Sequence, residues 1–210
     1  MRHAICSATL AAFTAIAVSF APFEAVMAKA PDVPAGNYKV DPAHASVTWK
    51  VNHLGLSSYT ARFTKFTASL EFDPADMAGS ILQVTIDPKS IKTDFPFVQK
   101  VNFDKKLAED PEYFNANAHP EITFASTKVE MESDTKAKVS GDLTLLGVTK
   151  PVTLDVTLNG SLNPQPFVNK PALGFSGSTT IKRSEFGFTK LIPSVGDDVE
   201  LLIEAEFLGE

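Results

Sequence analysis

The chain has 210 residues and a formal net charge of −6 at pH 7, with 19 lysine and arginine residues against 25 aspartate and glutamate residues. An acidic chain without a basic cluster argues against binding to nucleic acid and against electrostatic docking on anionic lipid headgroups. Its only cysteine is Cys6, which excludes a disulfide within the chain.

The N-terminus has the layout of a secretory signal peptide. Arg2 and His3 give a positive start, an apolar run extends from Ala4 to Ala21, and the small residues Val26 and Ala28 precede a cleavage position. A transmembrane helix is the alternative, because the run reaches the minimum of about 18 residues. Hydroxyl residues interrupt the run, however, and no basic stop-transfer cluster follows it, so we expect a signal peptide.

The expected organisation is therefore a signal peptide over residues 1–28, a Pro/Ala-rich linker over residues 29–36 and one domain over residues 37–210. After cleavage the chain contains no cysteine, so its stability must come from its core. We expect no stable membrane insertion once the signal peptide is removed.

Alternation of apolar and polar residues, which is typical of half-buried β-strands, dominates the rest of the chain. The predicted strands are Val47–Val51, Phe66–Phe72, Ile81–Ile86, Ile122–Met131, Val139–Leu145, Val152–Val156, Phe175–Ile181 and Val199–Phe207. Turns are expected at Asp73-Pro74, Asn159-Gly160 and Gly196-Asp197. Phe63 is out of phase with Phe66, which predicts a bulge or a corner between them. Short strands in sequential hairpins predict an all-β fold, either an antiparallel barrel or a sandwich of about eight strands.

One segment, residues 95–119, does not alternate. Pro96 suits the first turn of a helix, and Val98, Val101 and Leu107-Ala108 form a loose apolar stripe. Asp110-Pro111-Glu112 resembles a second short helical start. A short helical insert in an antiparallel barrel either crosses its outside or caps one end, so this segment is a candidate lid.

The sequence lacks the residue spacing of a catalytic or metal site. Three histidines, His44, His53 and His119, are scattered without the spacing of metal ligands. The nearest approach to a nucleophile elbow, residues 174–177, is one residue short and lies in a strand pattern. We therefore predict no catalytic residue, no metal site and no cofactor other than a bound lipid.

The stretch DLTLLGVTKPVTLDV, residues 142–156, forms two alternating runs across the break Gly147–Pro151. Leu143 and Leu145 share one face of the first run, and Val152, Leu154 and Val156 share one face of the second. A barrel of about eight strands is near the size at which the interior either fills with side chains or holds one small ligand. The alternation alone leaves both possibilities open.

Three stretches resemble the YceI-like family of exported, polyisoprenoid-binding, lipocalin-like proteins. They are VDPAHASVTWKVNHLGLSSYTARF (residues 40–63), HPEITF (residues 119–124) and GDLTLLGVTKPVTLDVTLNG (residues 141–160). The resemblance extends from about Gly36 to the C-terminus. It implies a lipocalin-like antiparallel barrel of about eight strands whose lumen holds a polyisoprenoid or another long-chain amphiphilic lipid, as a carrier, a reservoir or a sequestering factor.

The resemblance also implies which residues contact the ligand. Lumen-facing positions are Val47, Trp49, Val51, Phe66, Phe72, Phe124, Leu143, Leu154 and Val156; His53, Tyr59 and Arg62 lie near a polar head; and Phe97, Phe103 and Phe114 form part of the cover. Many members carry an Asp-x-His-Leu stretch in the insert, where this chain has Lys106 in place of the histidine. That departure leaves the identity of the head group open.

The resemblance further implies a periplasmic location and an amphiphilic lipid partner, with a second copy of the chain as an open alternative partner. Two other functions also remain open from the sequence. One is an enzyme that acts on a hydrophobic substrate through His53, Arg62 or a carboxylate, and the other is a filled barrel with a structural or partner-binding role.

Overall fold

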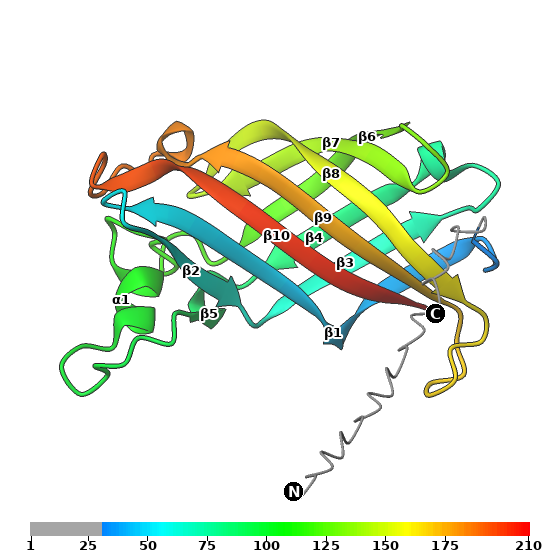
Figure 1. Cartoon of the computed structure of the whole chain (residues 1–210), viewed down its shortest axis with the longest axis horizontal. Coiled ribbons are helices and arrows are strands. Elements are labelled where there is room, and N and C mark those ends of the chain that lie inside the picture. Colours follow the sequence, from blue (N-terminus) through cyan, green and yellow to red (C-terminus); the bar gives the residue numbers. More distant parts are fainter. Residues whose placement is uncertain (1–30) are drawn as a thin grey trace, which may run out of the picture.

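The structure, a computed structural model, describes residues 31–210 and consists mainly of antiparallel strands with one short α-helix (Figure 1). The predicted signal peptide lies outside the described residues. Pro31 and Val33, which belong to the expected linker, are buried, so the packed part of the chain begins before the first strand. None of the helices within residues 31–210 is long and apolar enough to span a membrane.

The strands are β1 (Gly36–His53), β2 (Ser57–Phe63), β3 (Phe66–Phe72), β4 (Ile81–Ile86), β5 (Ile91–Lys92), β6 (Ile122–Met131), β7 (Lys136–Leu145), β8 (Val148–Leu162), β9 (Ala172–Lys182) and β10 (Val195–Gly209). The helix α1 (Phe103–Glu109) lies between β5 and β6. Three single 3₁₀ turns complete the chain: η1 (Met77–Gly79), η2 (Pro88–Ser90) and η3 (Arg183–Phe186).

Eight of these strands close a barrel, which confirms the predicted fold. They pair in the order β10-β9-β8-β7-β6-β4-β3-β1, and β1 pairs again with β10. Strand β1 is long enough to have two partners on its other edge, β3 along Gly36–Lys39 and β2 along Val47–His53. The short strand β5 extends β2 at the same end of the barrel. Closure gives each of the eight strands a neighbour on both sides, although β4 and β6 pair over only part of β6.

Two irregularities in the hydrophobic pattern have structural causes. Strand β2 ends at Phe63 and β3 begins at Phe66, which confirms the corner predicted from their phases. In β6 the pairing with β7 shifts between Ser126 and Lys128. An extra residue at such a bulge reverses the facing of the following side chains, which explains why apolar residues resume in the opposite phase at Val129.

Two predicted turns are wrong. Asn159-Gly160 lies inside β8, where the pairing with β9 shifts between Leu158 and Gly160, and the chain reverses only over residues 163–171. Gly196-Asp197 lies at the start of β10. Asn159-Gly160 has the local chemistry of a turn, but the longer pairing of β8 with β9 makes it a bulge rather than a reversal.

The break within residues 142–156 is shorter than predicted. The reversal between β7 and β8 involves only Leu146 and Gly147, whose φ angles of 53° and 74° are both left-handed. Two left-handed central residues are the mark of a type I′ hairpin, whose twist matches that of the flanking strands. Pro151 therefore lies within β8, opposite Asp142 of β7.

The helical insert is also shorter than predicted. Helix α1 starts after Asn102, whose side-chain oxygen accepts a hydrogen bond from the Lys105 amide at 3.0 Å, rather than at Pro96. Residues 97–100 form turns only, and Val98 is 61% exposed, so the first half of the expected apolar stripe has no surface to pack against. The second helical start expected at residues 110–112 is also a turn.

The barrel has two distinct ends (Figure 1). The capped end carries α1, the β1–β2 and β7–β8 hairpins and the loop before β10. The terminal end carries the C-terminus, the β3–β4 and β6–β7 connections and residues 163–171. Each end has its own cluster of buried side chains, the larger at the capped end around Phe63, Phe114 and Phe124, and the smaller at the terminal end around Tyr38, Leu173 and Phe207.

Candidate functional site: an apolar cavity in the barrel

A cavity of about 190 Å³ lies inside the barrel. It is bounded by the inward faces of the eight barrel strands, because alternate residues of each strand point to the same side of the sheet. Its walls are almost entirely aliphatic and aromatic. They include Val40, Ala68, Leu70, Leu82, Val84, Ile86, Val129, Ala137, Val139, Leu158, Phe175, Leu201, Ile203, Ala205 and Phe207.

Five of the residues predicted from the sequence line this cavity: Val47 on β1, Phe66 and Phe72 on β3, and Leu154 and Val156 on β8. Alternation placed these residues on one face of their strands, and the family resemblance implied that this face lines the lumen. The interior facing predicted for Leu154 and Val156 is therefore confirmed, while contact of all five with a ligand stays a prediction.

The cavity reaches the surface at the terminal end, beside η1 and the β6–β7 hairpin. Strand β4 pairs with β6 only from Gln83↔Ala125 to Ile86↔Ile122, so the second half of β6 has no β4 neighbour. At the resulting gap the cavity is lined by Met77, Ser80, Met131, Asp134 and Thr135, which we call the mouth. None of the mouth residues was predicted as a site residue. Met131 was predicted only as the end of a strand, and the other four lie at a 3₁₀ turn and in the tip of a hairpin, where no periodicity marks them.

The opposite end of the interior is filled by aromatic rings. We call Trp49, Tyr59, Phe63, Phe103, Phe114 and Phe188 the aromatic plug. Phe114, from the insert, meets Phe188 with ring centroids 5.3 Å apart, Phe63 at 5.5 Å and Trp49 at 6.5 Å. Phe103 of α1 packs edge-on against Tyr59 at 6.3 Å. The predicted covering positions of Phe103 and Phe114 are thus found, and the insert closes one end of the barrel.

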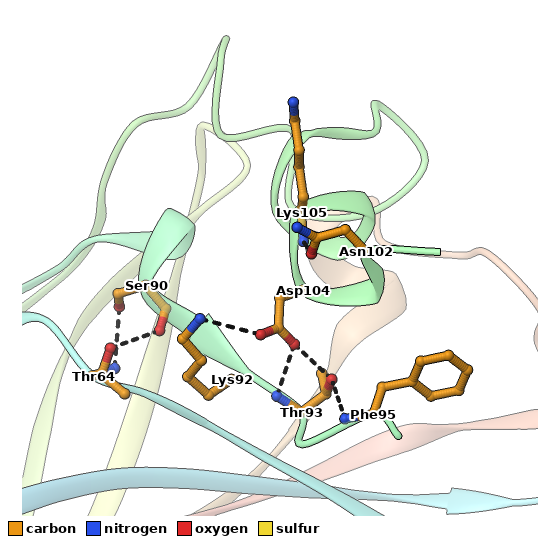
Figure 2. A network of polar contacts seen from close by, with 8 residues as sticks. All are labelled: Thr64, Ser90, Lys92, Thr93, Phe95, Asn102, Asp104 and Lys105. Atoms are coloured by element: carbon orange, nitrogen blue, oxygen red, sulfur yellow. Dashed lines mark hydrogen bonds and ion pairs between the residues drawn. The ribbon is translucent and has the colours of Figure 1, made fainter. Parts of the chain in front are cut away.

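A polar network around Asp104 anchors the insert to the barrel (Figure 2). One carboxylate oxygen of Asp104 accepts hydrogen bonds from the Thr93 amide at 3.0 Å and the Thr93 hydroxyl at 2.6 Å, and the other accepts from Lys92 Nζ at 3.3 Å. Burial alone raises the pKa of Asp104, but these hydrogen bonds outweigh it and hold the pKa below the usual value of an aspartate. The ionised form of Asp104 therefore holds α1 against β5.

Three buried polar atoms of the interior have no hydrogen-bond partner among residues 31–210. They are Trp49 Nε1 and the Tyr59 hydroxyl in the aromatic plug, and Ser80 Oγ at the mouth. Buried polar groups in folded proteins are almost always paired, so each of these three atoms can still form a hydrogen bond with a group outside residues 31–210.

The other predicted ligand-binding residues lie away from the cavity walls. Val51, Phe124 and Leu143 are buried in the core. His53 is exposed at the last residue of β1, and Phe97 is 56% exposed outside the barrel.

Arg62 requires a correction. It alternates with the buried Ala61 and Phe63, so its exposed side chain lies on the outer face rather than near the lumen. The reason is that the period of two that places Tyr59 inward necessarily places Arg62 outward. Lys106, at the position where the resemblance led us to expect a histidine, is exposed on α1.

An outer-surface cluster of Asp41, His44 and Glu206 was not anticipated from the sequence. Their potential ligand atoms lie within 4.8 Å of one another, since an irregularity in β1 between Val40 and Ala45 brings Asp41 and His44 together opposite β10. The hydrogen bond between His44 Nδ1 and Asp41, at 2.8 Å, raises the pKa of His44 and lowers that of Asp41. The cluster lies outside the cavity; the hydrogen bond joins only His44 and Asp41, while the charge of Glu206 also raises the pKa of His44.

Comparison with known proteins gives a consistent result over nearly the whole described chain. The family model described as YceI-like domain matches residues 38–207. A UPF0312 protein of Pseudomonas paraeruginosa is 36% identical over 194 residues, which cover 91% of this chain and 94% of the relative. A UPF0312 protein of Vibrio cholerae is 34% identical over 172 residues, which cover 81% of this chain and 87% of the relative.

Solved structures show the same architecture. The YCEI protein of Campylobacter jejuni matches with a TM-score of 0.64 and 32% identity, over 77% of this chain and 91% of that chain. A polyisoprenoid binding domain from Saccharophagus degradans matches with a TM-score of 0.61 and 14% identity, over 82% of this chain and 98% of that chain. At that identity the second match shows the shared fold alone.

Proposed function

The chain belongs to the YceI-like family, and from this premise we propose that it is a binding protein that holds a long-chain, isoprenoid-like lipid in its barrel. The observation that carries the proposal is the cavity of about 190 Å³, with apolar walls and a mouth at one end. The polyisoprenoid binding domain of Saccharophagus degradans, which has the same fold, supports the same class of ligand.

The cavity favours an apolar chain for energetic reasons. Each methylene group withdrawn from water contributes roughly 0.8 kcal/mol, so a chain of several carbons gains affinity without specific polar contacts. A protein cavity of about 150 Å³ holds one benzene molecule. The cavity of about 190 Å³ therefore encloses only a segment of a polyisoprenoid, and the remainder extends through the mouth or displaces rings of the aromatic plug.

The proposal favours binding over catalysis or a purely structural role. His53 and Arg62, the side chains that an acid–base mechanism was expected to use, are both exposed and line no part of the cavity. A filled barrel would leave no continuous apolar space, whereas this barrel contains an apolar cavity of about 190 Å³ besides its two clusters of buried side chains. Signal-directed export to the periplasm, with a role as carrier, reservoir or sequestering factor, is part of the same proposal and rests on the family and on the signal-like N-terminus.

A charge on the cavity wall tests the proposal. Val156→Asp puts a carboxyl group into the apolar cavity. Whether it is ionised or held protonated there, it makes burial of an apolar chain beside it less favourable. We expect at least a tenfold loss of affinity for geranylgeraniol, measured through the fluorescence of Trp49, the single tryptophan of the chain. The matched control is Thr153→Asp, which puts the same charge on the exposed outer face of β8. Equal affinities of the two variants for the lipid would contradict a site in the barrel.

A further inference from the structure

The aromatic plug contains two hydrogen-bond donors that the protein does not use. Trp49 Nε1 and the Tyr59 hydroxyl are both buried, and neither has a partner among the described residues. An indole N–H can only donate, and a phenol hydroxyl can donate or accept. A buried donor without an acceptor costs the folded state free energy, so its retention requires an explanation.

Trp49 lies beside residues that line the cavity, and Tyr59 lies beyond Trp49, farther from the cavity. Trp49 is two residues along β1 from Val47, which lines the cavity, and its partner across the sheet is Leu201, which lines it too. Tyr59 pairs with Val51 on the neighbouring strand, and its ring centroid lies 6.4 Å from that of Trp49. The end of a ligand that passes the cavity from the mouth therefore reaches Trp49 first and Tyr59 next.

The interior offers no positive charge to this end of a ligand. Within the described chain, no lysine or arginine lines the cavity, and its one charged residue is Asp134 at the mouth. The buried cation of the capped end, Arg183, donates to the carbonyl oxygens of Gly196, Phe188, Lys190 and Val195 at 2.8–3.1 Å. A phosphate or diphosphate brought to the plug would be buried without a counter-charge, which is strongly unfavourable.

We propose that the inner end of the site binds an uncharged carbonyl group at one end of the isoprenoid ligand. Trp49 Nε1–H and the Tyr59 hydroxyl donate to the two lone pairs of the carbonyl oxygen, and the apolar chain lies along the cavity toward the mouth. This inference rests on the proposed function and adds to it the chemical class and the orientation of the ligand. To reach these donors, the carbonyl end must displace aromatic rings of the plug beside Trp49. Phe114, which packs on Trp49, can move without opening the barrel wall because it belongs to the insert.

Three probes that share a farnesyl chain test this inference on the delipidated chain from residue 29 onward. They are farnesylacetone with a ketone, farnesene without a polar atom, and farnesyl diphosphate with an anionic end. Binding is followed through the fluorescence of Trp49 and by calorimetry. We expect Tyr59→Phe to weaken farnesylacetone binding about 3- to 10-fold, the effect of one hydrogen bond, and to leave farnesene binding unchanged. We expect farnesyl diphosphate to bind most weakly.

Two controls separate a binding role of Tyr59 from a structural one. Tyr113→Phe removes the hydroxyl of the tyrosine that packs against the other side of the plug, on Phe188, and should leave all three affinities unchanged. Tyr59→Phe should not lower the urea midpoint of the ligand-free protein, because the hydroxyl it removes has no partner.

The outcomes distinguish this inference from the proposed function. Equal effects of Tyr59→Phe on the ketone and the hydrocarbon, no effect on either, or tightest binding of the diphosphate would overturn the carbonyl site while leaving a lipid-binding barrel. Failure of the wild-type protein to bind any of the three probes would overturn the proposed function, and this inference with it.

Discussion

Asp104 is the residue that fixes the insert on the barrel. Its carboxylate accepts three hydrogen bonds from Lys92 and Thr93, which come just before the insert, while the side chain itself belongs to α1. Hydrogen bonds to a charged acceptor are stronger than those between neutral groups. A single side chain therefore contributes much of what holds α1 near the plug.

Asp104→Asn should loosen the insert. The asparagine amide is uncharged and has only one oxygen, so it cannot accept all the hydrogen bonds that the carboxylate accepts from Lys92 and Thr93. We therefore expect a loss of about 1–3 kcal/mol in the free energy of unfolding and faster hydrogen exchange of the α1 amides. Glu109→Gln, which removes an exposed carboxylate 3.8 Å from Lys105 on the same helix, is the control and should change stability by less than about 0.5 kcal/mol. Equal effects of both variants would show that Asp104 has no special anchoring role.

The same residue predicts a pH dependence. The pKa of Asp104 is lower in the folded protein than in the unfolded chain, so ionised Asp104 stabilises the fold above the unfolded pKa. That contribution is lost as the pH falls through the folded pKa. We expect the difference in urea midpoint between wild type and Asp104→Asn to shrink in this acidic range, and a constant difference from pH 7 to pH 2 would contradict the assignment.

At the scale of elements, the strands of the barrel could be predicted because their alternation is regular, and Leu154 and Val156 were placed in the interior for that reason. The ends of elements could not be predicted equally well. Asn159-Gly160 has the local chemistry of a turn, but its backbone is held in β8 by pairing with a strand that is distant in sequence. Where the helix starts depends on whether Val98 packs against another element. A sequence pattern cannot show this, and in the structure Val98 is exposed.

The close packing of β6 against β7 gives a prediction at this scale. A Cβ added at Gly141 meets the Ala125 carbonyl oxygen and the Phe124 ring, each at 2.5 Å, whereas a Cβ at Gly160 meets nothing within 4 Å. Gly141→Ala should therefore cost about 1–3 kcal/mol, since the backbone carbonyl cannot move aside easily. Gly160→Ala, in the next strand, should be neutral or slightly stabilising in the same urea titration. A neutral Gly141→Ala would show that the two strands have room to separate.

The interior of the molecule is partly filled and partly hollow. The aromatic plug and the insert fill the capped end, a smaller cluster of buried side chains packs at the terminal end, and the apolar cavity lies along the barrel wall up to the mouth. The sequence predicted a barrel but left both a filled and a hollow interior open, because alternation shows which residues face inward and not how much space remains between them. Only the packing of all eight strands together decides that question.

The most direct test of the lipid-binding account is native mass spectrometry of the mature protein, followed by solvent extraction and identification of what is released. The account predicts a one-to-one adduct that survives purification and resolves to a neutral isoprenoid or another long-chain lipid, and that is diminished in Val156→Asp but not in Thr153→Asp. A bare protein mass, unchanged after incubation with isoprenoid lipids, would contradict it.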